Sequence, residues 1–245
     1  MAVVAAISNQ KGGVGKTTSA VNTAAYLAAR GMRVLLVDLD GQSNATSSLG
    51  CTVGDGPSIH EVLVRSMPVM AVVQHTRICG LDVVPANASL VAAEIELAPQ
   101  IGREFKLRRA FQDITEYDFV LIDCPPSLGL LTVNGLAAAQ EVLVPIQCEY
   151  YALEGLSQLV RNVSLVQNNL NPSLQVRGIV LTMYDGRTKL SDQVQQEVRN
   201  HFGATVYRTV IPRTVRLSEA PSFGQPITVF DSLSRGALAY RELAK

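Results

Sequence analysis

Short runs of valine, isoleucine and leucine recur along the chain and are separated by longer stretches with helical periodicity. The runs do not alternate apolar with polar residues, which is typical of strands buried on both faces. They occupy residues 3–7, 34–37, 81–84, 119–122, 142–146 and 179–181. Helical periodicity appears over residues 17–29, 103–114, 130–138, 153–169 and 192–202, and residues 235–245 predict a short closing helix.

Strands that alternate with helices predict right-handed crossovers and an α/β fold, with a doubly wound, mostly parallel sheet flanked by helices. In such a sheet, ligands bind beyond the carboxyl ends of the strands. No stretch is long or biased enough to be a linker. We therefore expect a single domain over residues 1–245, with its functional loops directly after the strands.

The composition fits this fold and narrows the possible partners. Of the 245 residues, 47% are hydrophobic and 17% are charged, as in ordinary globular domains. Lysine plus arginine and aspartate plus glutamate number 21 each, so the formal net charge is zero and any nucleic-acid-binding surface must be a local patch. The cysteines are scattered, which favours reduced thiols over disulfides or zinc; they are Cys51, Cys79, Cys124 and Cys148.

The amino-terminal residues and the lengths of the apolar runs indicate the cellular location of the protein. The first apolar run leads straight into a glycine-rich loop and leaves no room for a secretory signal. No uncharged apolar run reaches the roughly 18 residues of a membrane-spanning helix. We expect a cytoplasmic protein without a membrane partner.

A glycine-rich loop follows the first predicted strand and leads into a helix. Such glycines let the backbone curl, so that N–H groups and the helix N-terminus point at phosphate oxygens. Lys16 would neutralise the β and γ phosphates, and the Thr17 hydroxyl would bind Mg²⁺. Gln10 stands where the generic phosphate-loop motif has glycine. The loop comprises Lys11, Gly12, Gly13, Val14, Gly15, Lys16, Thr17 and Thr18.

Two lysines in one loop need separate roles, because one loop wraps one triphosphate and Lys16 already serves it. The loop resembles the deviant Walker A signature of the ParA/MinD group of ATPases. This resemblance implies that Lys11 reaches across a nucleotide-sandwich dimer to the partner's phosphates. A positive charge that arrives only on dimerisation would stabilise phosphoryl transfer, as an arginine finger does.

Two aspartates, Asp38 and Asp40, follow the second predicted strand. Their spacing of two predicts side chains that point the same way, towards metal-bound water and the attacking water. The resemblance assigns the hydrolytic water and part of the metal site to Asp40. Gly41 and Ser43 depart from the usual Asp-Pro-Gln-Gly pattern of that family, whereas Gln42 keeps it.

A third aspartate, Asp123, ends the apolar run at residues 119–122. Four apolar residues followed by an acid form a Walker B strand, whose aspartate holds Mg²⁺. Together with Thr17 and Asp40, Asp123 completes the predicted magnesium site.

The ends of later strand-like runs are candidates for base recognition. In the family that the chain resembles, adenine packs at positions that correspond to Met183 and to the backbone near Pro212. ATP is therefore the expected nucleotide. Asp185 lies close by and leaves open an acidic reader of guanine.

Two basic clusters follow these runs, and arginines in polar loops commonly serve only solubility. Here the surrounding residues, Asp185 to Thr188 and Leu217 to Pro221, resemble the Soj branch of the ParA family. The resemblance implies that the arginines corresponding to Arg187 and Arg216 bind the DNA backbone. Sequence-independent phosphate contact in a dimer is the expected mode. The candidate DNA-binding residues are Arg187, Lys189, Arg213 and Arg216.

The resemblance covers nearly the whole chain and implies a ParA/Soj-type partitioning ATPase. Its ATP-bound homodimer would bind DNA on the nucleoid and leave it when a ParB/Spo0J-like partner stimulates hydrolysis. Three relatives share the nucleotide chemistry: a MinD-like membrane ATPase, an iron–sulfur carrier ATPase and a biosynthetic ligase such as dethiobiotin synthetase. The first would need an amphipathic membrane anchor, the second would need paired cysteines, and the third would have a loop without Lys11. A DNA-coating scaffold without catalysis conflicts with Asp40.

Overall fold

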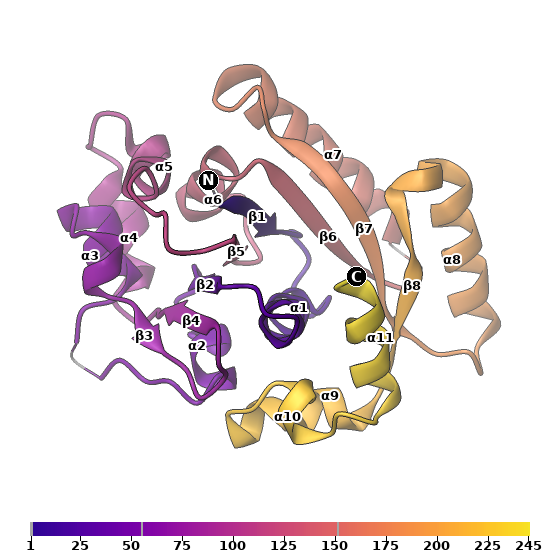
Figure 1. Ribbon diagram of the computed structural model, residues 1–245. Coiled ribbons are helices and arrows are strands. Elements are labelled where there is room, and N and C mark those ends of the chain that lie inside the picture. Colours follow the sequence, from indigo (N-terminus) through magenta and orange to yellow (C-terminus); the bar gives the residue numbers. More distant parts are fainter. Residues whose placement is uncertain (1, 55, 151) are drawn as a thin grey trace.

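A mixed sheet forms the centre of the molecule in the computed structural model, which describes residues 2–54, 56–150 and 152–245 (Figure 1). Within these ranges the sheet has eight strands in the order β3-β4-β2-β5-β1-β6-β7-β8. Every neighbouring pair is parallel except β3 with β4. The strands are β1 (Val3–Ile7), β2 (Val34–Asp38), β3 (Gln74–His75), β4 (Leu81–Val84), β5 (Phe119–Asp123), β6 (Glu141–Gln147), β7 (Gln175–Tyr184) and β8 (Val206–Pro212).

Helices cover both faces of the sheet, which confirms the predicted doubly wound α/β fold. One face carries α1 (Lys16–Ala29), α2 (Asn44–Ser48), α9 (Val215–Glu219), α10 (Ile227–Phe230) and α11 (Arg235–Leu243). The other face carries α3 (Ile59–Arg65), α4 (Leu90–Leu97), α5 (Lys106–Ala110), α6 (Leu130–Ala138), α7 (Ala152–Asn169) and α8 (Lys189–Phe202).

Strand β2 shows why the apolar runs do not alternate. Leu35 and Val37 pack into the core beneath α3 to α8, whereas Val34 and Leu36 pack into the core beneath α1 and α11. All four side chains are fully buried. A strand with helices on both faces has no face left for polar residues.

The predicted helix over residues 103–114 is wrong in its extent. Arg103–Phe105 forms a 3-10 turn, and α5 ends at Ala110. The Asn134 side chain of α6 explains the break, because it donates to the Arg103 carbonyl (2.8 Å) and accepts from the Leu107 amide (3.1 Å). A side chain from another helix satisfies backbone groups at this joint, which local periodicity cannot reveal.

The register of the central strands brings the functional loops together. Ile7 of β1 and Asp38 of β2 both lie opposite Asp123 of β5. The carboxyl ends of these three parallel strands therefore lie at one level. The loops that follow them meet at the same edge, where ligands bind in doubly wound sheets.

Candidate nucleotide-binding and hydrolysis site

The predicted phosphate loop connects β1 to α1 at this edge. Gly13 (φ 73°) and Gly15 (φ 86°) adopt the left-handed conformation that glycine tolerates best. Two side-chain bonds to neighbouring strands anchor the loop: Asn9 donates to the Pro145 carbonyl (2.7 Å), and Thr182 donates to the Val14 carbonyl (2.8 Å). The loop is thus held open at the amino end of α1, where backbone N–H groups favour an anion.

Lys16 lies inside this loop. Its residue is only 7% exposed, and its Nζ donates to the Lys11 carbonyl (3.1 Å). Burial lowers the pKa of Lys16, while the nearby carboxylates of Asp123 and Asp40 oppose the shift. The ammonium group therefore lies beneath the loop, close to the carboxylates of the predicted metal site.

Lys11 has a different environment from Lys16. Its side chain is exposed, and its Nζ lies 3.3 Å from Glu149 Oε2 in the loop after β6. Glu149 also accepts a hydrogen bond from Gln147. The two lysines of one loop thus occupy different environments, one buried and one at the surface. Sequence reasoning did not identify Glu149 as a partner, since the two residues are separated by 138 positions.

Asp123 lies at the carboxyl end of β5 and is 1% exposed. Neither of its carboxylate oxygens has a hydrogen-bond partner within the described residues. Burial raises the pKa of Asp123 well above its usual value, and Asp38 adds to this effect, whereas Thr17 and Lys16 oppose it. Buried polar atoms without partners are uncommon in native proteins and here indicate a site for a cation.

A metal ion bound at this edge of the sheet would have few protein ligands. No group of three or more His, Cys, Asp and Glu side chains in the described ranges is arranged to hold a metal ion. Mg²⁺ is commonly held by one or two carboxylates together with phosphate oxygens and water. Asp123, with the Thr17 hydroxyl beside it and Asp40 nearby, fits that donor set.

Asp38, at the end of β2, and Asp40, just after it, lie in different environments, which corrects the prediction that both face the reacting water. Asp38 is completely buried and accepts from the Thr46 amide (2.8 Å) and hydroxyl (2.7 Å). These bonds hold α2 against β2 and leave Asp38 unavailable to water. Strand alternation fails here because β2 ends at Asp38 and the chain turns immediately.

Asp40 is the carboxylate that stays accessible. It is half-buried, and its Oδ1 accepts a hydrogen bond from the Gln42 amide (3.0 Å). Within the described residues Oδ2 of Asp40 has no hydrogen-bond partner. Gly41 allows the loop to approach α4 closely, since a Cβ at that position would lie 2.8 Å from Val91 Cγ2.

A cavity of about 350 Å³ opens beside the phosphate loop. Gly15 and Thr18 form one side, and the predicted base-contact residues Met183 and Pro212 form another. Met183 adopts a left-handed conformation (φ 51°), which is rare for a residue with a long side chain. Asp185 does not line the cavity, and a bidentate contact from Arg187 holds its pKa well below the usual range.

The predicted DNA-binding residues follow β7 and β8: Arg187 and Arg213 lie in the loops, Lys189 begins α8, and Arg216 lies in α9. The Arg213 amide donates to the Tyr184 carbonyl (2.9 Å), which joins the two loops. Arg187 is paired with Asp185 (2.7 Å), and Arg216 with Glu219 (3.1 Å) and Asp231 (3.3 Å). In the described parts of the chain, Lys189 and Arg213 form no ion pair. All four basic side chains are exposed, and none of the described helices is long and apolar enough to cross a membrane.

Comparison with known proteins places these features in a family. A family model described as an AAA domain matches residues 2–176. The sporulation initiation inhibitor protein Soj of Bacillus subtilis is 54% identical, with 100% of this chain and 98% of that protein covered. The chromosome partitioning protein ParA of Myxococcus xanthus is 52% identical, with 98% and 85% covered.

A solved structure has the same fold over the full chain. Cobyrinic acid a,c-diamide synthase from Mycobacterium smegmatis, with bound ADP and magnesium, is 42% identical. The TM-score is 0.87, and the comparison covers 100% of this chain and 93% of that one. Full-length identity above one half with partitioning proteins, together with the two separated lysines of the phosphate loop, shows that this chain belongs to the ParA/Soj family of chromosome-partitioning ATPases.

Proposed function

We propose that this chain is a slow, Mg²⁺-dependent ATPase whose ATP-bound dimer binds DNA without sequence preference. Hydrolysis, stimulated by a ParB-like partner, releases the dimer from the nucleoid in the cytoplasm. The main support for this proposal is that the two lysines of one loop lie in different environments, one buried and one exposed. Buried Lys16 would serve a nucleotide in its own subunit, whereas Lys11, at the surface beside Glu149, would contact the phosphates bound by a second molecule.

ATP binding rests on the loop and the adjoining cavity. Backbone N–H groups of residues 12–18 would surround the phosphates, with the charge of Lys16 beneath them. The base would enter the cavity between Met183 and Pro212. Adenine is favoured over guanine because Asp185, the one acidic candidate for reading guanine, is engaged by Arg187 outside that cavity.

The metal site would be held by Thr17 and Asp123, with Asp40 nearby. Mg²⁺ bound there would neutralise charge on the β and γ phosphates. Asp123 fits this role because its buried oxygens accept no hydrogen bond within the described parts of the chain. A cation would add to the partial compensation that Thr17 and Lys16 give the buried carboxylate.

Asp40 would position the water that attacks the γ-phosphorus. Its Oδ1 is fixed by the Gln42 amide, so Oδ2 is left to accept a hydrogen bond from that water. The water oxygen forms a bond to the γ-phosphorus while the bond to the β–γ bridging oxygen breaks, and the water proton leaves towards Asp40 and solvent. No covalent enzyme intermediate is required.

Dimerisation would complete the site. Lys11 would leave Glu149 and place its charge near the partner's phosphates, where charge develops in the transition state. The same step would join two copies of the basic loops that carry Arg187, Lys189, Arg213 and Arg216. Four phosphate contacts give weak binding at physiological salt, whereas a doubled set binds through avidity.

Phosphate release tests this function against the biosynthetic alternative that the name of the Mycobacterium smegmatis structure suggests. We expect slow release of phosphate from ATP with Mg²⁺ in buffer that contains neither a carboxylic acid acceptor nor an amine donor. EDTA should abolish it, and DNA together with a ParB-like protein should accelerate it. Turnover that requires an acceptor and a donor would contradict the proposal.

A further inference from the structure

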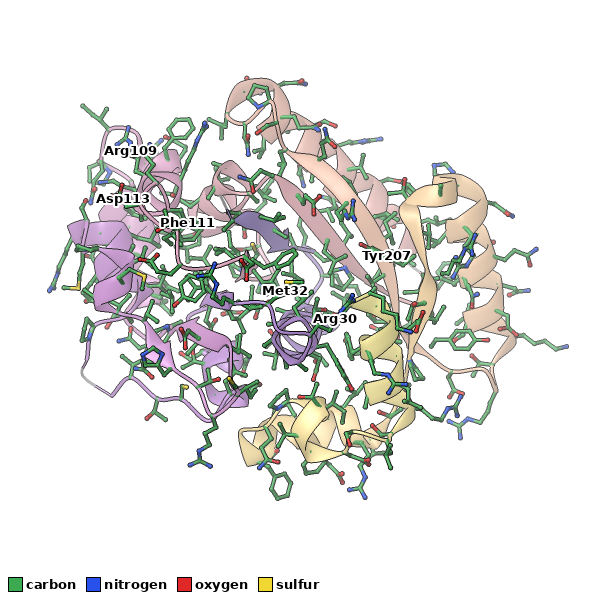
Figure 2. The ribbon with its side chains drawn as sticks, in the orientation of Figure 1. Arg30, Met32, Arg109, Phe111, Asp113 and Tyr207 are labelled. Carbon is green, nitrogen blue, oxygen red and sulfur yellow. The ribbon has the colours of Figure 1, made fainter. Side chains whose placement is uncertain are left out.

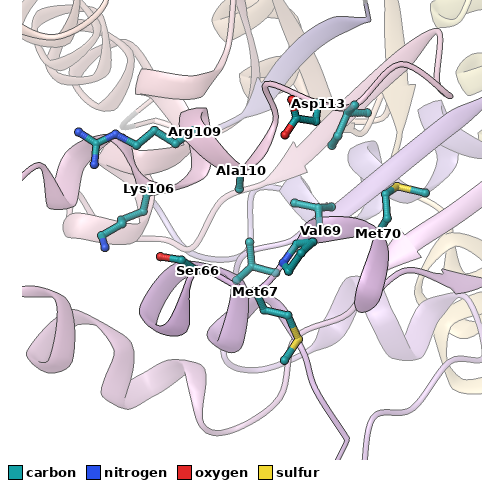
Figure 3. A pocket seen from close by; sticks show the side chains of 11 residues that line it. Ser66, Met67, Val69, Met70, Lys106, Arg109, Ala110 and Asp113 are labelled. Atoms are coloured by element: carbon teal, nitrogen blue, oxygen red, sulfur yellow. The ribbon is translucent and has the colours of Figure 1, made fainter.

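A hollow that the nucleotide chemistry does not use lies between α3 and α5 (Figure 3). Its volume is about 390 Å³, slightly larger than that of the cavity beside the phosphate loop. Met67, Val69 and Met70 line one part of it, and Lys106 and Arg109 line another. Figure 3 shows the two cationic side chains on the Ser66 side of the hollow, away from Met70.

The hollow lies away from the nucleotide and from the basic loops. Asp113 and Ile114 line it and lead into the amino end of β5, whereas the phosphate loop follows the carboxyl end of β1. Ile114 also lines a second hollow, next to Ala2 and Val4 at the amino end of β1. Figure 2 shows Arg109 and Asp113 near α5, on the opposite side of the view from Tyr207 of β8. A ligand here would leave the nucleotide edge free.

The charges of α5 are not balanced by neighbours. Lys106, Arg108 and Arg109 form no ion pair with any described residue. Arg103, one turn earlier, is by contrast paired with Glu104 (3.1 Å). In a protein with no net charge, three unpaired cations on one short helix form a local positive surface.

The apolar part of the hollow has the character of a binding surface. Met70 is 44% exposed although it lies beside buried Val69. Methionine side chains are flexible and polarisable, and they occur often where a surface accepts varied apolar groups. A concave site with apolar lining and a few polar or charged groups is the usual form of a ligand-binding pocket.

We propose that this hollow binds a partner protein through a short peptide segment that is acidic and carries a large apolar side chain. The carboxylates of the segment pair with Lys106 and Arg109, and the apolar side chain packs on Met67 and Met70. Asp113 lines the same hollow, away from the two cations, so it excludes an acid there and fixes the direction of the segment. A concave pocket of this size suits a peptide side chain better than a flat membrane or a convex DNA duplex.

Selection from a library of random dodecapeptides displayed on phage tests the proposal, in about 150 mM salt and without nucleotide. Peptides enriched on the wild-type protein should be net acidic and contain Leu, Ile, Met or Phe. Their affinity should fall at least tenfold for Lys106→Glu/Arg109→Glu, and also for Met70→Glu, an exposed position where folding is not at risk. The matched control Arg161→Glu/Arg208→Glu makes the same charge change on α7 and β8, and it should alter affinity less than twofold.

Three results would overturn the proposal. They are an absence of enriched peptides, enrichment of basic or uncharged peptides, and equal loss of affinity in the control variant. Vesicles of phosphatidylglycerol and an unrelated DNA duplex serve as competitors, and displacement of the peptide by either would assign the hollow to lipid or DNA instead. Because no step needs ATP, failure here is independent of the proposed partitioning function, and phosphate release should be unchanged in all three variants.

Discussion

Lys11 Nζ lies 3.3 Å from Glu149 Oε2, and this ion pair links the phosphate loop to the loop after β6. Both side chains are nearly half exposed, at 43% and 47%. An exposed ion pair stabilises a protein by only about 0.2–1 kcal/mol. The contact therefore favours this position of Lys11 in the monomer only weakly, so it can be exchanged for a phosphate.

Replacing Glu149 by glutamine should favour dimerisation. Without its carboxylate partner Lys11 is free, and dimerisation releases one such pair in each subunit, so the ATP-dependent dimer should form with up to about 30-fold higher affinity, the equivalent of about 2 kcal/mol. Analytical ultracentrifugation with ATP and Mg²⁺ measures this change. Glu154→Gln, an exposed acid on α7, is the matched control and should have no effect. A dimer weakened tenfold by Glu149→Gln would show that this carboxylate helps the dimer instead.

Substitutions of Lys16 and Lys11 should have different effects on ATP binding. Lys16→Ala removes a buried charge beside the phosphates, and loss of such a charged hydrogen bond costs about 1.5–3 kcal/mol, so ATP affinity should fall by about tenfold to a hundredfold or more. Lys11→Ala should keep ATP affinity within about threefold in the monomer but fail to dimerise or hydrolyse ATP. Titration of a fluorescent ATP analogue into dilute protein distinguishes them. Equal loss in both variants would refute a role for Lys11 in the partner's site.

Asp40→Ala should bind ATP and stop turnover. It removes the group that positions water but no part of the phosphate loop, so the hydrolysis rate should fall by about 10² to 10⁴. The protein should accumulate as an ATP-locked dimer in sedimentation experiments. Asp113→Ala, a carboxylate far from the loop, should retain wild-type turnover. A monomeric Asp40→Ala protein that hydrolyses ATP normally would remove Asp40 from the mechanism.

Asp123→Asn should weaken metal binding but increase the stability of the folded protein in the absence of metal. In EDTA the variant should be more stable than the wild type by about 1–3 kcal/mol, because the buried carboxyl accepts no hydrogen bond from the described residues and carries a desolvation cost. The raised pKa of Asp123 means that the folded state binds a proton that the unfolded state releases. The free energy of unfolding of the wild type should therefore fall as pH rises above about 4, relative to the variant.

Urea unfolding at several pH values measures this difference, with and without Mg²⁺ and ATP. The wild type should gain stability from the two ligands together, whereas Asp123→Asn should gain much less. A variant that is destabilised in EDTA and still responds fully to Mg²⁺ and ATP would show that Asp123 does not hold the metal.

The central strands could be predicted because their burial on both faces is visible in their own residues. Strands with helices on both faces must be apolar throughout, so the first strand was predicted at its observed bounds and the later ones within a few residues. Edge strand β8 carries Tyr207, Arg208 and Thr209 one after another between Val206 and Val210, so only its apolar end was recognised. Short helices such as α3 (7 residues) and α4 (8 residues) were missed because about two turns are too short to show a clear helical period.

The candidate site also has a part that could be predicted from the sequence and a part that could not. The glycine pattern around Lys16 determines loop geometry by itself, so the sequence predicted the loop. The burial of Asp38 depends on Thr46, and the position of Lys11 depends on Glu149, a residue from another loop. Contacts of this kind arise from the packed structure and leave no spacing signal in the sequence.

ATP-dependent DNA binding tests the account most directly. Arg216 is held by Glu219 and Asp231 in the monomer, so DNA must displace carboxylates, and four basic residues per subunit offer about eight phosphate contacts in a dimer. We would measure the affinity of the ATP-locked Asp40→Ala protein for several unrelated duplexes over a salt series, with Arg216→Ala and the control Arg77→Ala, an exposed arginine beside β3 at the opposite edge of the sheet. The account predicts binding only with ATP, no sequence preference, and a salt slope flattened by about 2 for Arg216→Ala alone. Equal binding without nucleotide, strong preference for one duplex, or an unchanged slope would contradict it.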